Sequence, residues 1–442
     1  MTVPTPPFVS GAKPGLGHAL EFQQDRTSLV QRGFAEHGSV FAIKLANQNV
    51  AIVIGPENQK TFFMETDKKL NIQEPYRFLH AIFGEVLFLA PHDEYLRQRP
   101  FVQEMFKREK MLHYIDVMQD VIQAWLDSLG DSGEMELNTQ IVTLVQEVAG
   151  NCFLGSEAHR QIGREFWDLY LDLSKALDPL LPPNLPLPKF IKRDRAKARM
   201  SDILRPIIAE RRQNPEKYDD FLQDLIMKED RSGVPIDEEL VRNMLLGLMF
   251  AGHETTAGHA AWSIILLLQH PDYLQRVLAE LAELAPRNTH ITPQAMVKLE
   301  HVGWLTQEVE RLRPSADMLM RVVKEDTEFG GYVVPAGWLV QVSQDIAHRL
   351  PLYFDQPEDF DPLRFAPDRA EDKQHRFSLI GFGGGAHKCT GMNFANNEIT
   401  LIVTMLFREF ELELVTKDPY VVHGVGASHP SATTVRYRRR SS

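Results

Sequence analysis

The chain has 442 residues, of which 43% are hydrophobic and 24% charged, and no Gly/Ser-rich linker divides it, so we expect one domain over residues 1–442. A formal net charge of −12 excludes nucleic acid from the expected partners, because phosphate binding requires a positive surface. Two cysteines, Cys152 and Cys389, are too few for a disulfide framework and favour a reducing, cytoplasmic location.

The N-terminal half predicts a small sheet followed by helices. Residues 1–17 are rich in Pro and Gly and contain no apolar segment of the length that a membrane requires, so we expect no transmembrane anchor. Residues 40–45 and 50–54 carry β-branched side chains around a turn-prone Asn-Gln-Asn sequence, which predicts a hairpin. Between about residues 107 and 228 apolar residues recur every three or four positions, which predicts several helices interrupted by a proline-rich loop at 178–189.

The longest predicted helix begins at Asp237, a good N-cap residue, and ends at His270 before Pro271. At 1.5 Å per residue it is about 50 Å long, and its middle is apolar on both faces, so we expect a buried central helix. A second helix is predicted over residues 302–312 and ends before Pro314.

Strand-like segments follow at residues 319–323 and 332–342. We therefore expect a mainly α-helical fold with small β-sheets. Its β-rich lobe combines about residues 35–60 with C-terminal strands at about 319–345, and helices form the rest of the chain.

Residues 382–391 read Phe-Gly-Gly-Gly-Ala-His-Lys-Cys-Thr-Gly and precede a helical run. A thiolate binds haem iron only where its charge is stabilised, which the N–H groups of a glycine turn and the start of a helix provide. We predict that Cys389 ligates the metal, that Gly383 lets the backbone wrap the sulfur, that Phe382 keeps water from it and that His387 donates to a propionate. The alternatives are a buried inert thiol and a dinucleotide fingerprint, which lacks a βαβ context here.

The long helix carries Ala-Gly-His-Glu-Thr-Thr at residues 251–256, which interrupts its apolar sequence. Buried polar groups cost stability unless they have partners, so we interpret this stretch as functional. Ala251 leaves room for oxygen, Thr255 bonds to the carbonyl four residues earlier or holds a water, and Glu254 relays protons from solvent. The alternative is a helix kink with a solvated acid. A metalloprotease motif is excluded because His259 is six residues after His253.

Glu308 and Arg311 are three residues apart on the second helix and share a face of it. Most such pairs are surface salt bridges that contribute little to stability. If the pair is buried and joined by Arg364, it becomes a core ionic network, which we predict from the spacing of about 80 residues before the cysteine loop.

Two further sets of candidate residues are dispersed along the chain. Cationic or phenolic groups that can neutralise haem propionates are Tyr76, Arg97, Arg321 and His387, although each alone is more often an ordinary surface or capping residue. Apolar residues that can line a substrate pocket are Phe78, Leu79, Phe83, Val86, Met249, Ala251, Met318 and Met320.

Together, the cysteine loop, the helix at 251–256, the Glu308/Arg311 pair and the Pro-Leu-Arg-Phe stretch at 362–365 resemble the signature set of the cytochrome P450 family, in the family's order. The resemblance implies the family's mainly helical fold, haem b between the long helix and the cysteine loop, and O₂ reduced with electrons from a partner. No flavin or iron–sulfur domain follows Ser442, so it also implies a separate ferredoxin-type donor with an NAD(P)H-dependent reductase.

Within the family, residues 76–85, 319–322 and 435–439 resemble bacterial sterol 14α-demethylases. The departures from that group are Ala81 in place of a proline, Leu89 and Ala90 in place of an aromatic–acid pair, and Glu254 in place of a histidine. The Glu-Thr pair resembles soluble retinoid and fatty-acid hydroxylases instead.

The leading hypothesis is a monooxygenase that inserts one oxygen atom of O₂ into a C–H bond of a large apolar substrate, sterol-like or terpenoid. A fatty-acid or retinoid hydroxylase of the same family is the alternative. From another class, a non-oxygenating haem-thiolate binding protein or isomerase remains open, although such a protein needs no proton relay like Glu254 and Thr255.

Overall fold

Helices form most of the chain in the computed structural model, which describes residues 3–179, 181–229, 233–316, 318–424 and 427–441. The α-helices are α1 Ala19–His37, α2 Pro56–Glu65, α3 His80–Phe83, α4 His92–Met105, α5 Arg108–Ser128, α6 Leu137–Leu154, α7 Ser156–Lys175, α8 Pro188–Gln213, α9 Phe221–Ile226, α10 Glu238–Gln269, α11 Pro271–Leu284, α12 Pro293–Lys298, α13 Glu300–Leu312, α14 Gln344–Ala347 and α15 Met392–Glu409. Short 3₁₀ helices are η1 Glu74–Leu79, η2 Leu87–Leu89, η3 Pro215–Lys217, η4 Pro362–Phe365, η5 Glu371–Lys373 and η6 Gly385–His387.

The strands are short and form four small sheets among the described residues. Their bounds are β1 Val40–Leu45, β2 Gln48–Val53, β3 Leu70–Asn71, β4 Ser132–Glu136, β5 Met318–Val323, β6 Thr327–Phe329, β7 Tyr332–Val334, β8 Leu339–Ser343, β9 Phe410–Leu414, β10 Val421–His423, β11 Ser428–Pro430 and β12 Thr434–Arg439. This composition confirms the predicted mainly α-helical fold with small sheets.

The chain forms two compact units, which we describe one at a time. The first unit contains Met1–Pro75 and Gly303–Cys389, and the second contains Tyr76–Val302 and Thr390–Ser442. The first unit thus joins two distant parts of the sequence.

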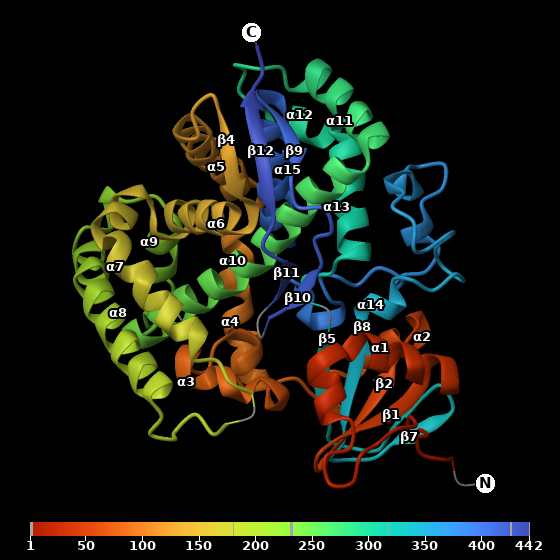
Figure 1. Cartoon of the computed structure of the whole chain (residues 1–442). Coiled ribbons are helices and arrows are strands. Elements are labelled where there is room, and N and C mark those ends of the chain that lie inside the picture. Colours follow the sequence, from red (N-terminus) through yellow and green to blue (C-terminus); the bar gives the residue numbers. More distant parts are fainter. Residues whose placement is uncertain (1–2, 180, 230–232, 317, 425–426, 442) are drawn as a thin grey trace. The chain divides into compact units, whose positions relative to one another are not determined.

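A five-stranded sheet in the order β1-β2-β8-β5-β3 is the centre of the first unit. Figure 1 shows β1 and β2, near the start of the chain, beside β8 and β5 from its last third. β2 pairs with β8 in parallel and the other neighbours are antiparallel. Alternate residues point to opposite faces of a strand, so Phe41 and Ile43 pack with α1 while Val40 packs with Phe62 and Phe63 of α2.

The long helix α10 is the centre of the second unit, with α6 and α15 packed against it. It begins one residue after Asp237, whose carboxylate accepts a hydrogen bond of 2.6 Å from the Leu240 N–H, so the predicted N-cap is confirmed. Strand β11 passes so close to α10 that a Cβ on Gly258 would lie 2.7 Å from the Ser428 carbonyl oxygen. A separate sheet has the order β4-β12-β9.

The structure confirms the predicted hairpin as β1 and β2, and the predicted second helix as α13. The single strand expected over residues 332–342 is wrong, because the segment forms β7 and β8 with a turn between them. Proline has no N–H to donate to a sheet, and Gly337 has a φ of 87°, so Pro335 and Gly337 end one strand and start another. Among the described helices, none is long and apolar enough to cross a membrane.

Candidate active site

The cysteine loop of the first unit is a tight turn with its thiol at the surface. The Cys389 N–H donates to the Phe382 carbonyl at 2.9 Å, which closes the loop, and the Gly383 N–H donates to the Ile380 carbonyl at 2.8 Å. Gly383 has a φ of 71°, a conformation that favours glycine. Gly384 lies against α2, where a Cβ would be 2.8 Å from the Phe63 ring. Cys389 is exposed, so a group that binds at the loop can reach its sulfur.

Polar side chains anchor the segment that leads into this loop. The Gln344 amide donates to the Ile380 carbonyl at 2.7 Å, and the Ile380 N–H donates to His348 Nε2 at 2.9 Å. Burial lowers the pKa of His348 to about 3, so its ring is neutral and accepts this hydrogen bond. Both backbone polar groups of Ile380, its N–H and its carbonyl, are therefore fixed three residues before Gly383.

Glu310 is a second anchor that the sequence analysis missed. Its carboxyl accepts hydrogen bonds from the backbone N–H groups of Gly381 and Phe382. Burial raises its pKa to about 7, while those two N–H groups and Lys388 act in the opposite direction and Asp372 raises it further. The sequence offered one indication that Glu310 has a partner: it lies between Glu308 and Arg311 on a helix that also has buried residues.

Arg321 and His387, predicted to neutralise propionates, contact neighbouring residues of the first unit. The Arg321 Nε–H donates to Thr66 Oγ1 at 3.1 Å, and its guanidinium lies 4.7 Å from the centre of the Phe62 ring. His387 Nε2 lies 2.5 Å from Asp67 Oδ2. The structure thus brings these two side chains onto the same short segment, and Asp67 is a partner that sequence reasoning did not identify.

The three charged residues proposed as a network meet in the core of the first unit. Arg311 donates to both carboxylate oxygens of Glu308 at 2.8 Å, and Arg364 Nε lies 3.2 Å from Glu308 Oε2. All three side chains are fully buried. Arg311 also donates to the His348 carbonyl at 3.1 Å, which links this network to the anchor of the cysteine loop.

In the second unit, residues 251–256 form a partly exposed stretch of α10, and residues 257–267, which follow it, are all buried. Ala251 is exposed, while Glu254 and Thr255 are partly buried. The Thr255 hydroxyl donates to the Ala251 carbonyl at 2.7 Å, as the sequence analysis anticipated. Glu254 Oε1 accepts from the Ser174 hydroxyl of α7 at 3.1 Å. Ser174 is a partner that no local pattern indicated.

His253 is buried beside the polar pair, with its Nδ1 3.4 Å from the Tyr170 hydroxyl. Burial lowers the pKa of His253 to about 4, so the ring is neutral near pH 7. This residue therefore supports the helix packing and does not provide a proton at neutral pH.

Tyr76 and Arg97 belong to the second unit. The Tyr76 ring packs edge-to-face on Phe88 at 5.7 Å between centroids. Arg97 donates twice to the Glu94 carboxylate, each at 2.7 Å, and this pairing lowers the pKa of Glu94. Their predicted role as propionate partners stays a prediction.

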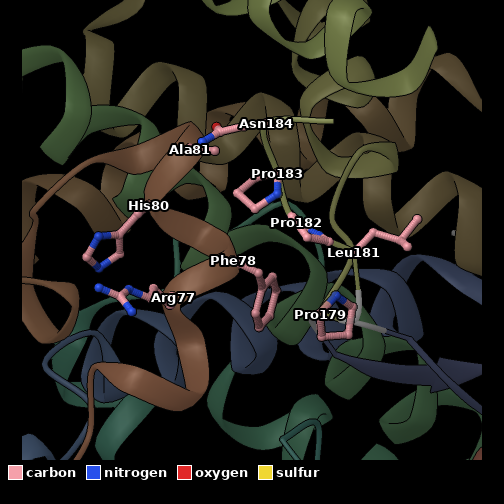
Figure 2. Close-up of a pocket in the computed structure, with 9 residues that line it drawn as sticks. All are labelled: Arg77, Phe78, His80, Ala81, Pro179, Leu181, Pro182, Pro183 and Asn184. Carbon is pink, nitrogen blue, oxygen red and sulfur yellow. The ribbon is translucent and has the colours of Figure 1, made fainter. Parts of the chain in front are cut away.

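The second unit also contains a cavity of about 600 Å³ (Figure 2). It is lined by Arg77, Phe78, His80, Ala81, Pro179, Leu181, Pro182, Pro183 and Asn184. Of the predicted pocket residues, Phe78 lines this cavity, whereas Leu79, Phe83, Val86 and Met249 are buried in the packing of the unit. Met318 and Met320 are partly buried on β5 of the first unit.

Comparison with known proteins gives the family. The family model described as Cytochrome P450 matches residues 6–427. The sterol 14α-demethylase of Mycolicibacterium vanbaalenii is 32% identical over 98% of both chains, and the sterol 14-demethylase of Arabidopsis thaliana is 32% identical over 98% of this chain and 91% of its own. The solved structure of retinoic acid bound cyanobacterial CYP120A1 has a TM-score of 0.89, with 26% identity and full coverage of both chains.

The chain therefore belongs to the cytochrome P450 family. It is a monooxygenase that uses a haem cofactor. The residues fit such a group, because the exposed Cys389 thiol lies on a tight glycine turn, and a thiol is the side chain that binds iron in this class of enzyme.

Proposed function

We propose that this monooxygenase inserts one oxygen atom into a C–H bond of a large apolar substrate, sterol-like or terpenoid, and that Cys389 ligates the haem iron. The observation that carries the ligand assignment is the exposed Cys389 thiol on the loop closed by the Phe382 carbonyl. The second cysteine, Cys152, is buried in α6, and burial raises the pKa of its thiol, which disfavours the thiolate that iron requires.

When bound, haem supplies the reduction and activation of O₂, and the side chains hold the substrate and move protons. In this proposal Thr255 holds a water or a proton donor near Ala251, and Glu254 passes protons inward from solvent through the Ser174 hydroxyl. Thr255 and Glu254 are consecutive on α10, so one helix carries both functions.

The electron donor in this proposal is a separate ferredoxin-type protein served by an NAD(P)H-dependent reductase, in the cytoplasm. The cysteine content supports this compartment, because one thiol is buried, the other is exposed, and neither forms a disulfide.

A sterol-like or terpenoid substrate is supported by 32% identity to sterol 14-demethylases from a bacterium and a plant. A retinoid is the second candidate, favoured by the likeness to the P450 whose solved structure holds retinoic acid. Ala81, Leu89 and Ala90 depart from the sterol demethylase pattern, and Ala81 lines the cavity of Figure 2. We therefore define the substrate class broadly, as an apolar polycyclic or isoprenoid molecule.

The absorption spectrum of the dithionite-reduced, CO-treated protein tests the ligand assignment. We expect the red-shifted Soret band of thiolate-bound haem in the wild type and in Cys152→Ala, and its loss in Cys389→Ala. A normal band in Cys389→Ala would show that another group binds the iron. Product analysis with sterols, triterpenes and retinoids then tests the substrate class.

A further inference from the structure

Helix α7 of the second unit consists of two helical segments that meet at Gly163. This residue has a φ of 60° and a ψ of −167°, which lie outside the helical range. Only glycine adopts this pair of angles readily, because a Cβ would clash with the neighbouring backbone. The surroundings leave room for a side chain, since no described atom outside its own turn of helix lies within 4 Å of a Cβ placed there. The break therefore depends on the backbone freedom of this one residue.

The segment before the break, residues 156–162, is fixed on α6. His159 Nε2 lies 2.8 Å from Glu147 Oε2. The His159 ring also packs so closely on α6 that a Cβ on Gly150 would lie 2.3 Å from its Nδ1. Helix α7 lies against both α6 and α8 (Figure 1). The first segment thus gives α7 a fixed starting direction.

The segment after the break, residues 164–175, reaches the polar stretch of α10. The Tyr170 hydroxyl lies 3.4 Å from His253 Nδ1. One turn later, the Ser174 hydroxyl donates to Glu254 Oε1 at 3.1 Å. Residues four positions apart lie on the same face of a helix, so one face of this segment makes both contacts.

The buried faces of the two segments would not coincide on one straight helix. The buried side chains are Ala158 and Ile162 before the break and Phe166, Trp167, Tyr170 and Leu173 after it. At 3.6 residues per turn, the centres of these two sets would lie about a quarter of a turn apart on an unbroken helix. An unbroken helix that starts from His159 would therefore turn the second segment about its axis and carry the Ser174 hydroxyl away from Glu254.

We propose that Gly163 is a positioning residue for proton delivery, because its conformation turns the second segment of α7 so that Ser174 meets Glu254. The inference rests on the proposed function, in which Glu254 passes protons inward through the Ser174 hydroxyl. Gly163 acts through the backbone of α7 and is itself exposed. A single methyl group at this exposed position should then weaken a contact eleven residues further along the helix.

The first test measures the contact between Ser174 and Glu254 in the haem-loaded protein. Denaturant unfolding of Ser174→Ala, Glu254→Ala and the double variant gives an interaction factor, by which the unfolding equilibrium constant departs from the product of the two single effects. We expect a factor of about tenfold, since hydrogen bonds to charged groups are among the stronger ones. The same cycle in the Gly163→Ala background should give a factor near one.

Gly130→Ala is the matched control for backbone strain. Gly130 also has a positive φ, of 72°, and no described atom within 4 Å of an added Cβ, but it follows α5 and is not in α7. The cycle in the Gly130→Ala background should keep the interaction factor of the wild type.

The second test measures product per NAD(P)H with whichever sterol, triterpene or retinoid the enzyme oxidises. Ser174→Ala and Gly163→Ala should each lower this ratio. The variant that combines them should be no lower than Ser174→Ala alone, because both changes remove the same contact. Additive losses would show that Gly163 acts by another route and would overturn the proposal.

The interaction factor decides the proposal even if no substrate is oxidised. A factor near one in the wild type would overturn it, and so would an unchanged factor in Gly163→Ala or an equal loss in Gly130→Ala. Failure of the proposed function would be distinct. In that case Ser174→Ala would leave product per NAD(P)H unchanged, or no product would form, although the interaction factor is lost only in Gly163→Ala.

Discussion

Glu310 packs so closely on Gly381 that a Cβ on that glycine would lie 2.2 Å from the Glu310 Cγ. The same carboxyl accepts the Gly381 and Phe382 N–H groups, so it fixes the backbone from which the cysteine loop starts. This contact should make the stability of the protein depend on pH and should make the loop sensitive to substitution of Gly381.

The first prediction concerns pH. The pKa of Glu310 rises from 4.5 to about 7 on folding, so the folded protein binds the proton more tightly than the unfolded chain does. The contribution of Glu310 to the free energy of unfolding is then largest below pH 4.5 and falls as pH rises through about 7. Above that pH the lost contribution amounts to about 3 kcal/mol. Glu310→Gln removes this titration, so its stability relative to wild type should rise between pH 5.5 and 8.5.

Denaturant unfolding across that pH range measures the difference. The exposed Glu328, on β6 of the same unit, provides the control variant Glu328→Gln, whose difference from wild type should stay flat. A flat difference for Glu310→Gln as well would show that Glu310 does not change protonation on folding.

The second prediction concerns Gly381. Gly381→Ala forces the Glu310 side chain or the loop to move, at a cost of about 1–3 kcal/mol, and should decrease the thiolate Soret band of the reduced CO complex. The double variant Gly381→Ala/Glu310→Ala has room for the new methyl group but lacks the carboxyl that anchors the loop, so its band should recover to the level of Glu310→Ala alone. Gly303→Ala, with no atom within 4 Å of the added Cβ, should behave as wild type. No recovery in the double variant would contradict this explanation.

The third prediction concerns the buried charges. Arg311→Ala leaves Glu308 without its bidentate partner in the core, which should cost about 3–5 kcal/mol. Thermal unfolding and the yield of haem-loaded protein measure the loss. Arg436→Ala breaks exposed ion pairs with Glu134 and Glu413 and should cost less than about 1 kcal/mol. Similar losses in the two variants would mean that burial does not determine the cost.

The fourth prediction concerns the delivery of protons by Thr255 and Glu254. Thr255→Ala should keep haem and ligand binding but send more reducing equivalents to hydrogen peroxide, so product per NAD(P)H falls more than NAD(P)H consumption. Ser174→Ala, which removes the Glu254 partner, should show a smaller effect in the same direction. The Thr143 hydroxyl in α6 also donates to the carbonyl four residues earlier. Thr143→Ala is therefore the control for loss of this kind of hydrogen bond, and it should leave coupling unchanged. Unchanged coupling in Thr255→Ala would refute the role.

Local sequence patterns predicted the parts of the fold that depend on neighbouring residues. Asp237 capped the long helix as expected, and Gly383 and Gly385 of the cysteine loop have φ angles of 71° and 64°, which favour glycine. Contacts between distant residues were harder to predict. His387 meets Asp67 across 320 positions, and no pattern near either residue indicates the other.

At some positions the sequence also did not predict which side chains are buried. Phe78 and Phe83 looked equivalent in the sequence, yet Phe78 lines the cavity while Phe83 packs on Phe250 at 4.9 Å between ring centroids. Which side of a short helix faces the core depends on what packs on it, and Leu79 is buried for that reason.

The parallel pairing of β2 with β8 imposes an order on synthesis. Val50 pairs with Leu339, so 289 residues must leave the ribosome after Val50 before this pairing can form. At 5–20 residues per second the delay is on the order of tens of seconds. During that time the β1–β2 hairpin presents an unpaired, apolar strand edge, which is a template for aggregation. Nascent chains that stop before β8 should therefore depend on chaperones more than chains that extend beyond it.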